Sequence, residues 1–178
     1  MVDSQVRPND APDLAIQDAM RALPREDFLP PGKRHLAYAD AQAQYAPGRW
    51  LLSPREVSKL LHALRARPGE RALAIAAPYA AAVLETMGLS VTRLDGEDLT
   101  TVTGTWPVIV CEGCVTRAPP SWLSALAPEG RLACVEREGP TGRAMLYLRT
   151  DQATSGRPVF DCTAPLMAGF AETAGFVF

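Results

Sequence analysis

Two cysteines and the acidic residue between them are the first candidates for chemistry in this chain. Cys111 and Cys114 form a C-x-x-C motif with Glu112 inside it. The other thiols and imidazoles are scattered: Cys134, Cys162, His35 and His62. A zinc site needs four ligands, and thioredoxin-type chemistry needs the motif at the start of a helix near the N-terminus. The spacing therefore favours four reduced, buried thiols over a metal centre or a redox centre.

Glu112 is the acidic residue best placed to bind something. It directly follows a continuous apolar run, residues 106–111, rich in β-branched residues, which is typical of a strand buried on both faces. Open α/β folds bind ligands beyond the carboxyl ends of their strands. Asp95 ends a second apolar strand, residues 90–95, and is a candidate for the same reason.

The composition excludes several classes of protein. The chain has 178 residues, a net charge of −2 and 21% charged residues. A nucleic-acid binder or a polybasic membrane-surface protein carries a clustered positive charge instead. No run of 18 apolar residues could span a membrane, and the polar, acidic start does not read as a secretory signal. We expect a cytoplasmic protein that binds neither nucleic acid nor membrane.

The pattern of apolar residues predicts an α/β fold around a mainly parallel sheet. A leading helical segment is expected over residues 1–66 and a sheet over 67–178, within one domain. The expected helices are 10–23 with Asp10 as N-cap, a turn at 33–39, 53–65, 79–87 and 119–126. The expected strands are 71–76, 90–95, 106–111, 131–136 and 143–149, the last two as a hairpin, with an irregular loop at 41–52.

Several strings, in order along the whole chain, resemble the protein-L-isoaspartate O-methyltransferase family. They are Gln5–Asp10, Asp18–Met20, Leu23–Pro30, Ala37–Asp40, Arg67–Arg71, Ala81–Leu84 and Leu126–Leu132. The resemblance implies a Rossmann-like fold that depends on S-adenosylmethionine. It also implies an enzyme that methylates isoaspartyl carboxylates in damaged proteins.

The turn that binds the cofactor in that family is altered here. The family has a glycine-rich turn preceded by an acid, because glycine permits positive φ and close approach of the backbone to a ligand. In this chain the acid is replaced by Ala74, the glycines by Ala76, Ala77 and Pro78, and only Tyr79 is kept. The resemblance thus implies a relic cofactor site made of Ala76, Ala77, Pro78, Tyr79, Asp95 and Glu112.

The family's catalytic-region serine is also displaced. Leu52 occupies its position and Ser53 follows one residue later. A shift of one residue at a helix start turns a side chain by about 100° around the axis. Ser53, followed by Pro54 and Glu56, reads better as the N-cap of the next helix.

An internal deletion removes one strand and one helix of the family's fold. Only about ten residues separate Asp95 from Trp106. Asp95 matches one of two acids of the family: the one that holds the ribose, or one that follows the third strand. The strand that ends at Asp95 directly follows the 81–87 helix in the sequence, which favours the first match. The strand 90–95 then becomes a sheet edge. Residues 96–105 are expected to lie along this edge as a cover, unless two copies of the chain meet there.

Two functions follow from these departures. In the first, the chain is a non-catalytic methyltransferase-like protein that needs no cofactor and acts as a binding or regulatory module, with a protein partner or a second copy. In the second, it is still an S-adenosylmethionine-dependent protein carboxyl methyltransferase with a rebuilt turn. The turn at Ala76–Pro78 discriminates between them, because the enzyme needs free backbone amides and open space above it.

Overall fold

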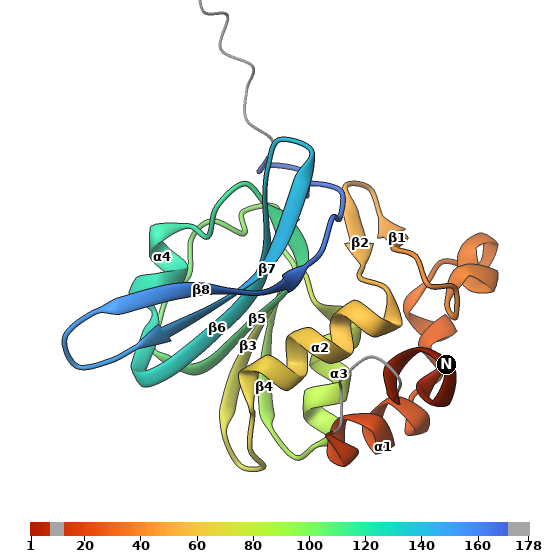
Figure 1. Cartoon of the computed structure of the whole chain (residues 1–178), viewed down its shortest axis with the longest axis horizontal. Helices are drawn as coiled ribbons and strands as arrows, with labels where there is room; N and C mark the ends of the chain where they lie inside the picture. Colours follow the sequence, from red (N-terminus) through yellow and green to blue (C-terminus); the bar gives the residue numbers. More distant parts are fainter. Residues whose placement is uncertain (8–12, 171–178) are drawn as a thin grey trace, which may run out of the picture.

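A six-stranded sheet forms the centre of the computed structural model, which describes residues 1–7 and 13–170 (Figure 1). Its strands, in spatial order, are β4 (Ser90–Leu94), β3 (Arg71–Ile75), β5 (Trp106–Val115), β6 (Leu126–Glu138), β7 (Thr141–Arg149) and β8 (Thr154–Asp161). The first four are parallel, and β7 and β8 are each antiparallel to their neighbours. The predicted α/β, Rossmann-like fold is confirmed.

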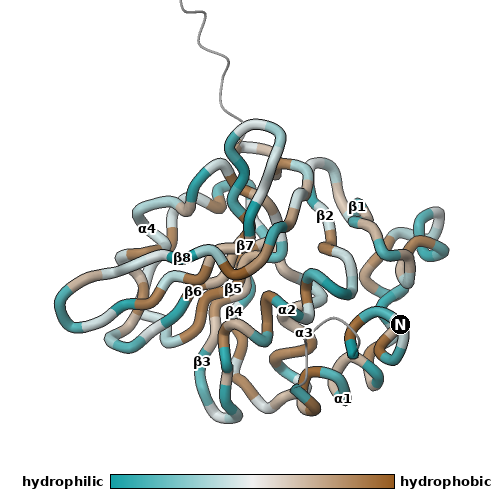
Figure 2. The backbone as a smooth tube through the Cα atoms, viewed as in Figure 1, coloured by the Kyte–Doolittle hydropathy of each residue, from teal (hydrophilic) through white to brown (hydrophobic). Residues whose placement is uncertain are grey.

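The two faces of the sheet are covered differently. Helices α1 (Leu14–Ala22), α2 (Pro54–Leu64) and α3 (Pro78–Thr86) share one apolar core with Ala72 and Ala74 of β3. On the other face, Leu73 and Ile75 join a second core with the short helix α4 (Pro120–Ser124). Residues of one strand thus alternate between two cores. Figure 2 accordingly shows the most hydrophobic backbone in the central strands and the helices against them. No helix in the described ranges is long and apolar enough to cross a bilayer.

The segment before α2 contains a hairpin that the sequence did not predict. It consists of β1 (Ala43–Ala46) and β2 (Arg49–Leu51), where an irregular loop was expected. Pro47 and Gly48 form the turn between the strands, and Gly48 has a φ of +66°. The expectation of a loop was therefore wrong, because this Pro-Gly pair is the tip of a hairpin.

The start of helix α2 has the capping hydrogen bonds that the sequence predicted. The Ser53 hydroxyl accepts from the Glu56 N–H at 3.3 Å, while the Glu56 carboxylate accepts from the Ser53 N–H at 3.0 Å. This is a complete capping box, as predicted. The predicted N-cap of α1, Asp10, lies outside the described residues, and Asp13 caps this helix, accepting from the Ala15 N–H at 3.0 Å.

In the six-stranded sheet, two strands extend further than the sequence indicated, and one was missed. β5 runs through the C-x-x-C motif to Val115, so Glu112 lies inside the strand and not after it. β6 begins at Leu126 and includes the expected turn at 128–130 as an irregularity, with Glu129 at a φ of +57°. β8 was not predicted.

Strand β4 lies at the edge of the sheet, as predicted. Within the described residues, no backbone hydrogen bond joins 96–105 to β4. The segment instead crosses the face that carries α4: Leu99 is buried in that core, and its carbonyl accepts from the Trp122 indole at 2.7 Å. Because it packs as irregular chain and not as a strand, it covers a face of the sheet and leaves the edge unpaired.

Candidate functional site

A buried arginine lies behind the first turn of α3. Arg25 is only 1% exposed, its Nε donates to the Ala37 carbonyl at 3.0 Å, and another guanidinium nitrogen donates to the Leu52 carbonyl. Its guanidinium carbon lies 4.4 Å from the centre of the Tyr79 ring. Arg25 therefore ties the N-terminal segment to α3.

Glu112 faces this arginine from the central strand. It is fully buried, its Oε2 accepts from the Ala80 N–H at 2.9 Å, and its Oε1 lies 3.9 Å from Arg25 Nη1. Burial raises the pKa of Glu112 to about 7, although the positive charge of Arg25 acts in the opposite direction. The carboxylate expected to face a ligand is thus engaged with a helix start and a buried cation of its own chain.

This cluster is incompletely satisfied. Among the described residues, Arg25 Nη1, Glu112 Oε1 and the Tyr79 hydroxyl are buried without a hydrogen-bond partner. The Tyr79 ring also packs edge-on against Phe28, with ring centres 5.3 Å apart. Sequence reasoning named Tyr79 and Glu112 but missed Arg25, whose only signal was its place in the family-like string Leu23–Pro30.

The altered turn keeps a backbone shape that suits glycine. Ala76 has a φ of +44°, which costs a non-glycine residue about 1–2 kcal/mol. Its N–H donates to the Leu94 carbonyl at 2.9 Å, and both Ala76 and Ala77 are buried. Pro78 begins α3. The turn therefore carries the buried methyl groups of Ala76 and Ala77.

A segment of the chain itself lies across the carboxyl end of β5. Residues 162–170, which we call the strap, place the Met167 N–H on the Cys114 carbonyl at 2.8 Å and the Ala168 N–H on the Gly48 carbonyl at 3.1 Å. A Cβ added to Gly113 would collide with the Met167 side chain, and one added to Gly48 would collide with Ala168. The strap thus closes this end of the sheet against the β1–β2 hairpin.

The other site residues predicted from the sequence are Asp95, Leu52 and Ser53. Asp95 is exposed just beyond β4, where partial burial raises the pKa of its carboxyl. Leu52 and Ser53 are buried at the start of α2, and the Ser53 hydroxyl is occupied as a cap. The structure therefore brings Tyr79 and Glu112 together, places Asp95 at the surface and gives Ser53 a structural partner.

The four cysteines are free and buried, as predicted. Burial raises their pKa values, that of Cys114 to about 11, so the thiols stay protonated near neutral pH. In residues 1–7 and 13–170, no group of three or more His, Cys, Asp or Glu side chains is placed to hold a metal ion.

The amino-acid sequence was compared with family models and with curated proteins. No family model matches the chain. A protein-L-isoaspartate O-methyltransferase of Methylorubrum extorquens (strain PA1) is 39% identical over 97 residues, which are 53% of this chain and 42% of that protein. Protein-L-isoaspartate O-methyltransferase 1 of Rhodopseudomonas palustris (strain HaA2) is 38% identical over 97 residues, 53% of this chain and 40% of that protein. The matched part thus spans less than half the length of these curated relatives.

Solved structures show the same likeness in fold. A protein-L-isoaspartate O-methyltransferase structure superposes with a TM-score of 0.69 at 16% identity, covering 88% of this chain and 62% of that chain. A putative protein-L-isoaspartate O-methyltransferase from Plasmodium falciparum, in complex with S-adenosyl-L-homocysteine, gives 0.65 at 15% identity, covering 88% of this chain and 91% of that chain.

The fold therefore places the chain in the class of Rossmann-like methyltransferase folds. Within that class, the sequence matches relate it to the protein-L-isoaspartate O-methyltransferase family. The family resemblance drawn from the strings of the sequence is confirmed.

Proposed function

We propose that this chain is a non-catalytic, methyltransferase-like protein that acts as a binding or regulatory module. It works without S-adenosylmethionine, in the cytoplasm, and associates with a protein partner or with a second copy of itself. Its kinship to protein-L-isoaspartate O-methyltransferases gives it the scaffold. The observation that carries the proposal is the strap, residues 162–170, lying across the carboxyl end of the sheet.

The backbone N–H groups around the turn Ala76–Pro78 support the proposal that no cofactor binds there. Binding at a first strand-to-helix turn needs backbone amides that are free and close to the ligand. Here Pro78 has no N–H, the Ala76 N–H is bonded to Leu94, and the Ala80 N–H is bonded to Glu112. The amides of this turn are thus largely committed to the protein itself, and the residues present do not fit the amino-acid part of the cofactor.

The proposal is tested by methyl transfer to an isoaspartyl peptide with labelled S-adenosylmethionine. We expect no incorporation above the background without protein, while the Methylorubrum extorquens relative, assayed in parallel, methylates the peptide. Incorporation that disappears in Asp95→Asn would overturn the proposal, because it would show a rebuilt active site. Asp95→Asn is suited to this test because its side chain is exposed and the substitution should not unfold the protein.

A further inference from the structure

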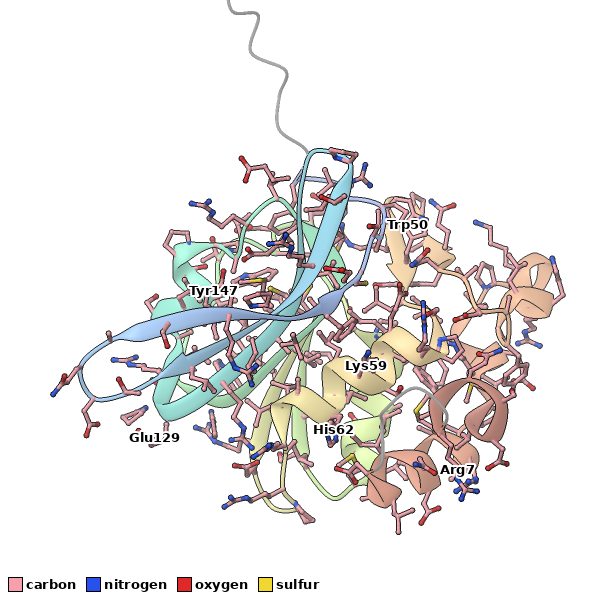
Figure 3. The ribbon with its side chains drawn as sticks, in the orientation of Figure 1. Arg7, Trp50, Lys59, His62, Glu129 and Tyr147 are labelled. Atoms are coloured by element: carbon pink, nitrogen blue, oxygen red, sulfur yellow. The ribbon has the colours of Figure 1, made fainter. Side chains whose placement is uncertain are left out.

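The far end of the sheet contains a cavity of about 580 Å³. It lies where α2 ends and β3 begins, and its other walls come from β6, β7 and β8. In Figure 3, Glu129 of β6 marks this end of the sheet, on the opposite side of the view from Trp50 of the β1–β2 hairpin. The cavity is therefore separate from the relic site.

Four arginines line this cavity, against two glutamates: Arg65, Arg67, Arg131 and Arg157, with Glu70 and Glu129. The lining carries two more positive than negative charges, although the whole chain has a net charge of −2. A local charge opposite to that of the molecule attracts small anions.

Only one of the four arginines is committed to the fold. Arg131 donates to the Leu64 carbonyl at 2.6 Å and forms two hydrogen bonds with Glu70, at 2.9 and 2.6 Å. It thereby satisfies the carboxyl end of α2 and neutralises Glu70, whose pKa it lowers. Within the described residues, the guanidinium groups of Arg65, Arg67 and Arg157 have no hydrogen bond or ion pair, although the backbone N–H of Arg67 donates to Glu70 at 2.7 Å and its charge also lowers the pKa of Glu70.

Two residues with left-handed backbone line the cavity, one of them Arg65, which ends α2. Arg65 has a φ of +46° and Glu129 a φ of +57°, so two of the three non-glycine residues with positive φ in the described chain line this cavity. The apolar floor of the cavity includes Leu146, which is buried, and Leu148, which is 39% exposed.

We propose that this cavity binds a small molecule with at least two anionic groups close together, such as a diphosphate or a short di- or tricarboxylate. The planar guanidinium group matches either anion with two parallel hydrogen bonds. Arg65 and Arg67 approach from the connection after α2 and Arg157 approaches from β8, while Leu148 contacts the uncharged part of the ligand. The volume is in the range of small-molecule sites. This site is independent of the proposed function, because it uses no residue of the relic site.

The test is a calorimetric titration of the full chain with pyrophosphate and, separately, with citrate, at constant ionic strength. We expect saturable one-to-one binding of at least one probe. Binding of pyrophosphate alone assigns the site to phosphates, binding of citrate alone assigns it to carboxylates, and binding of both assigns it to anions of either kind. No saturable binding of either probe would overturn the proposal.

Variants locate the binding. Arg67→Gln and Arg157→Gln remove one exposed guanidinium each, and both should weaken binding about tenfold, the size of a lost charge-assisted hydrogen bond. Arg55→Gln, at the other end of α2 and outside the cavity, removes the same charge and should leave the affinity unchanged. An equal loss of affinity in all three variants would show that the anion is attracted by the overall charge, and would contradict a binding site in this cavity.

Discussion

The two ends of the central sheet have opposite characters. At the carboxyl ends of the parallel strands, the strap, the β1–β2 hairpin and the Arg25–Glu112 pair fill the space with buried side chains. At the amino ends, exposed arginines surround an open cavity of about 580 Å³. Related folds bind their ligands at the carboxyl ends. In this chain the strap and the β1–β2 hairpin cover the carboxyl end of β5 at Cys114, and a smaller cavity of about 360 Å³ remains beside the carboxyl ends of β5 and β6. The amino end carries the larger, arginine-lined cavity.

At the carboxyl end of the sheet, residues in the position of a ligand-binding site pack as part of the protein core. Glu112 has the position of a ligand-facing acid, yet its carboxylate accepts from the Ala80 N–H and faces Arg25. The carboxyl end should therefore respond to mutation as a core does, through stability. The amino end should respond through binding, with little change in stability.

The largest effect is expected at Arg25. Arg25→Met keeps much of the side-chain volume but leaves Glu112 without its cation and the carbonyls of Ala37 and Leu52 without a donor. Removing one partner of a buried ion pair costs about 3–5 kcal/mol. Urea unfolding at pH 8 measures the loss. The exposed Arg34→Met should change stability by less than about 0.5 kcal/mol, and a similarly small loss for Arg25→Met would contradict the account of a core.

The second effect is a dependence on pH. Because the folded pKa of Glu112, about 7, lies above its usual value near 4.5, the folded state favours the protonated carboxyl. Its contribution to stability is complete below about pH 4.5 and falls as pH rises to about 7, on the order of 3 kcal/mol at 1.4 kcal/mol for each pKa unit.

Glu112→Gln tests this dependence, since an amide still accepts from the Ala80 N–H but does not titrate. The free energy of unfolding of this variant should decline less between pH 4.5 and 7 than that of the unmodified protein. The exposed Glu97→Gln should keep the original profile. Parallel profiles for Glu112→Gln and the unmodified protein would exclude Glu112 as the titrating group.

A smaller effect is expected where the strap meets the hairpin. Gly48→Ala places a methyl group against Ala168 at a φ of +66°, and overpacking with backbone strain costs about 1–3 kcal/mol. Gly69→Ala is the matched control, because Gly69 also has a positive φ, +84°, and nothing lies within 4 Å of its Cβ. Equal stability of the two variants would mean that the strap does not pack against this turn.

The smallest effect is expected at the start of α2. Ser53→Ala removes the hydroxyl that accepts from the Glu56 N–H, and loss of an N-cap costs about 1 kcal/mol. Thermal unfolding should show a modest decrease in midpoint. A stability unchanged by this substitution would separate Ser53 from the capping role.

Local signals in the sequence predicted much of this fold. The apolar run before Cys111 predicted a central buried strand, and Ser53 and Glu56 predicted a helix start, because these patterns depend on near neighbours. β8 was missed because it is exposed along nearly its whole length, so no alternation marks it, and Gly156 and Pro158 resemble a loop. Such an edge strand is defined by its pairing with β7 and not by its own residues.

The candidate site was predictable only in part. Its position directly after an apolar run made Glu112 conspicuous, and the departure from the family-like pattern was visible at Ala76–Pro78. The partner Arg25 is distant in sequence and lies in a string full of charges, so nothing local distinguished it from a surface residue. The strap was equally hidden, because its packing depends on the absence of a side chain at Gly113.

We propose that the carboxyl end of the sheet does not bind S-adenosylmethionine. Calorimetric titration with S-adenosyl-L-homocysteine tests it most directly, with the Methylorubrum extorquens relative as the binding control. We predict no saturable heat up to millimolar ligand and no thermal stabilisation. Micromolar binding, or the stabilisation of about 2.7 kcal/mol that a hundredfold excess over the dissociation constant produces, would contradict the claim.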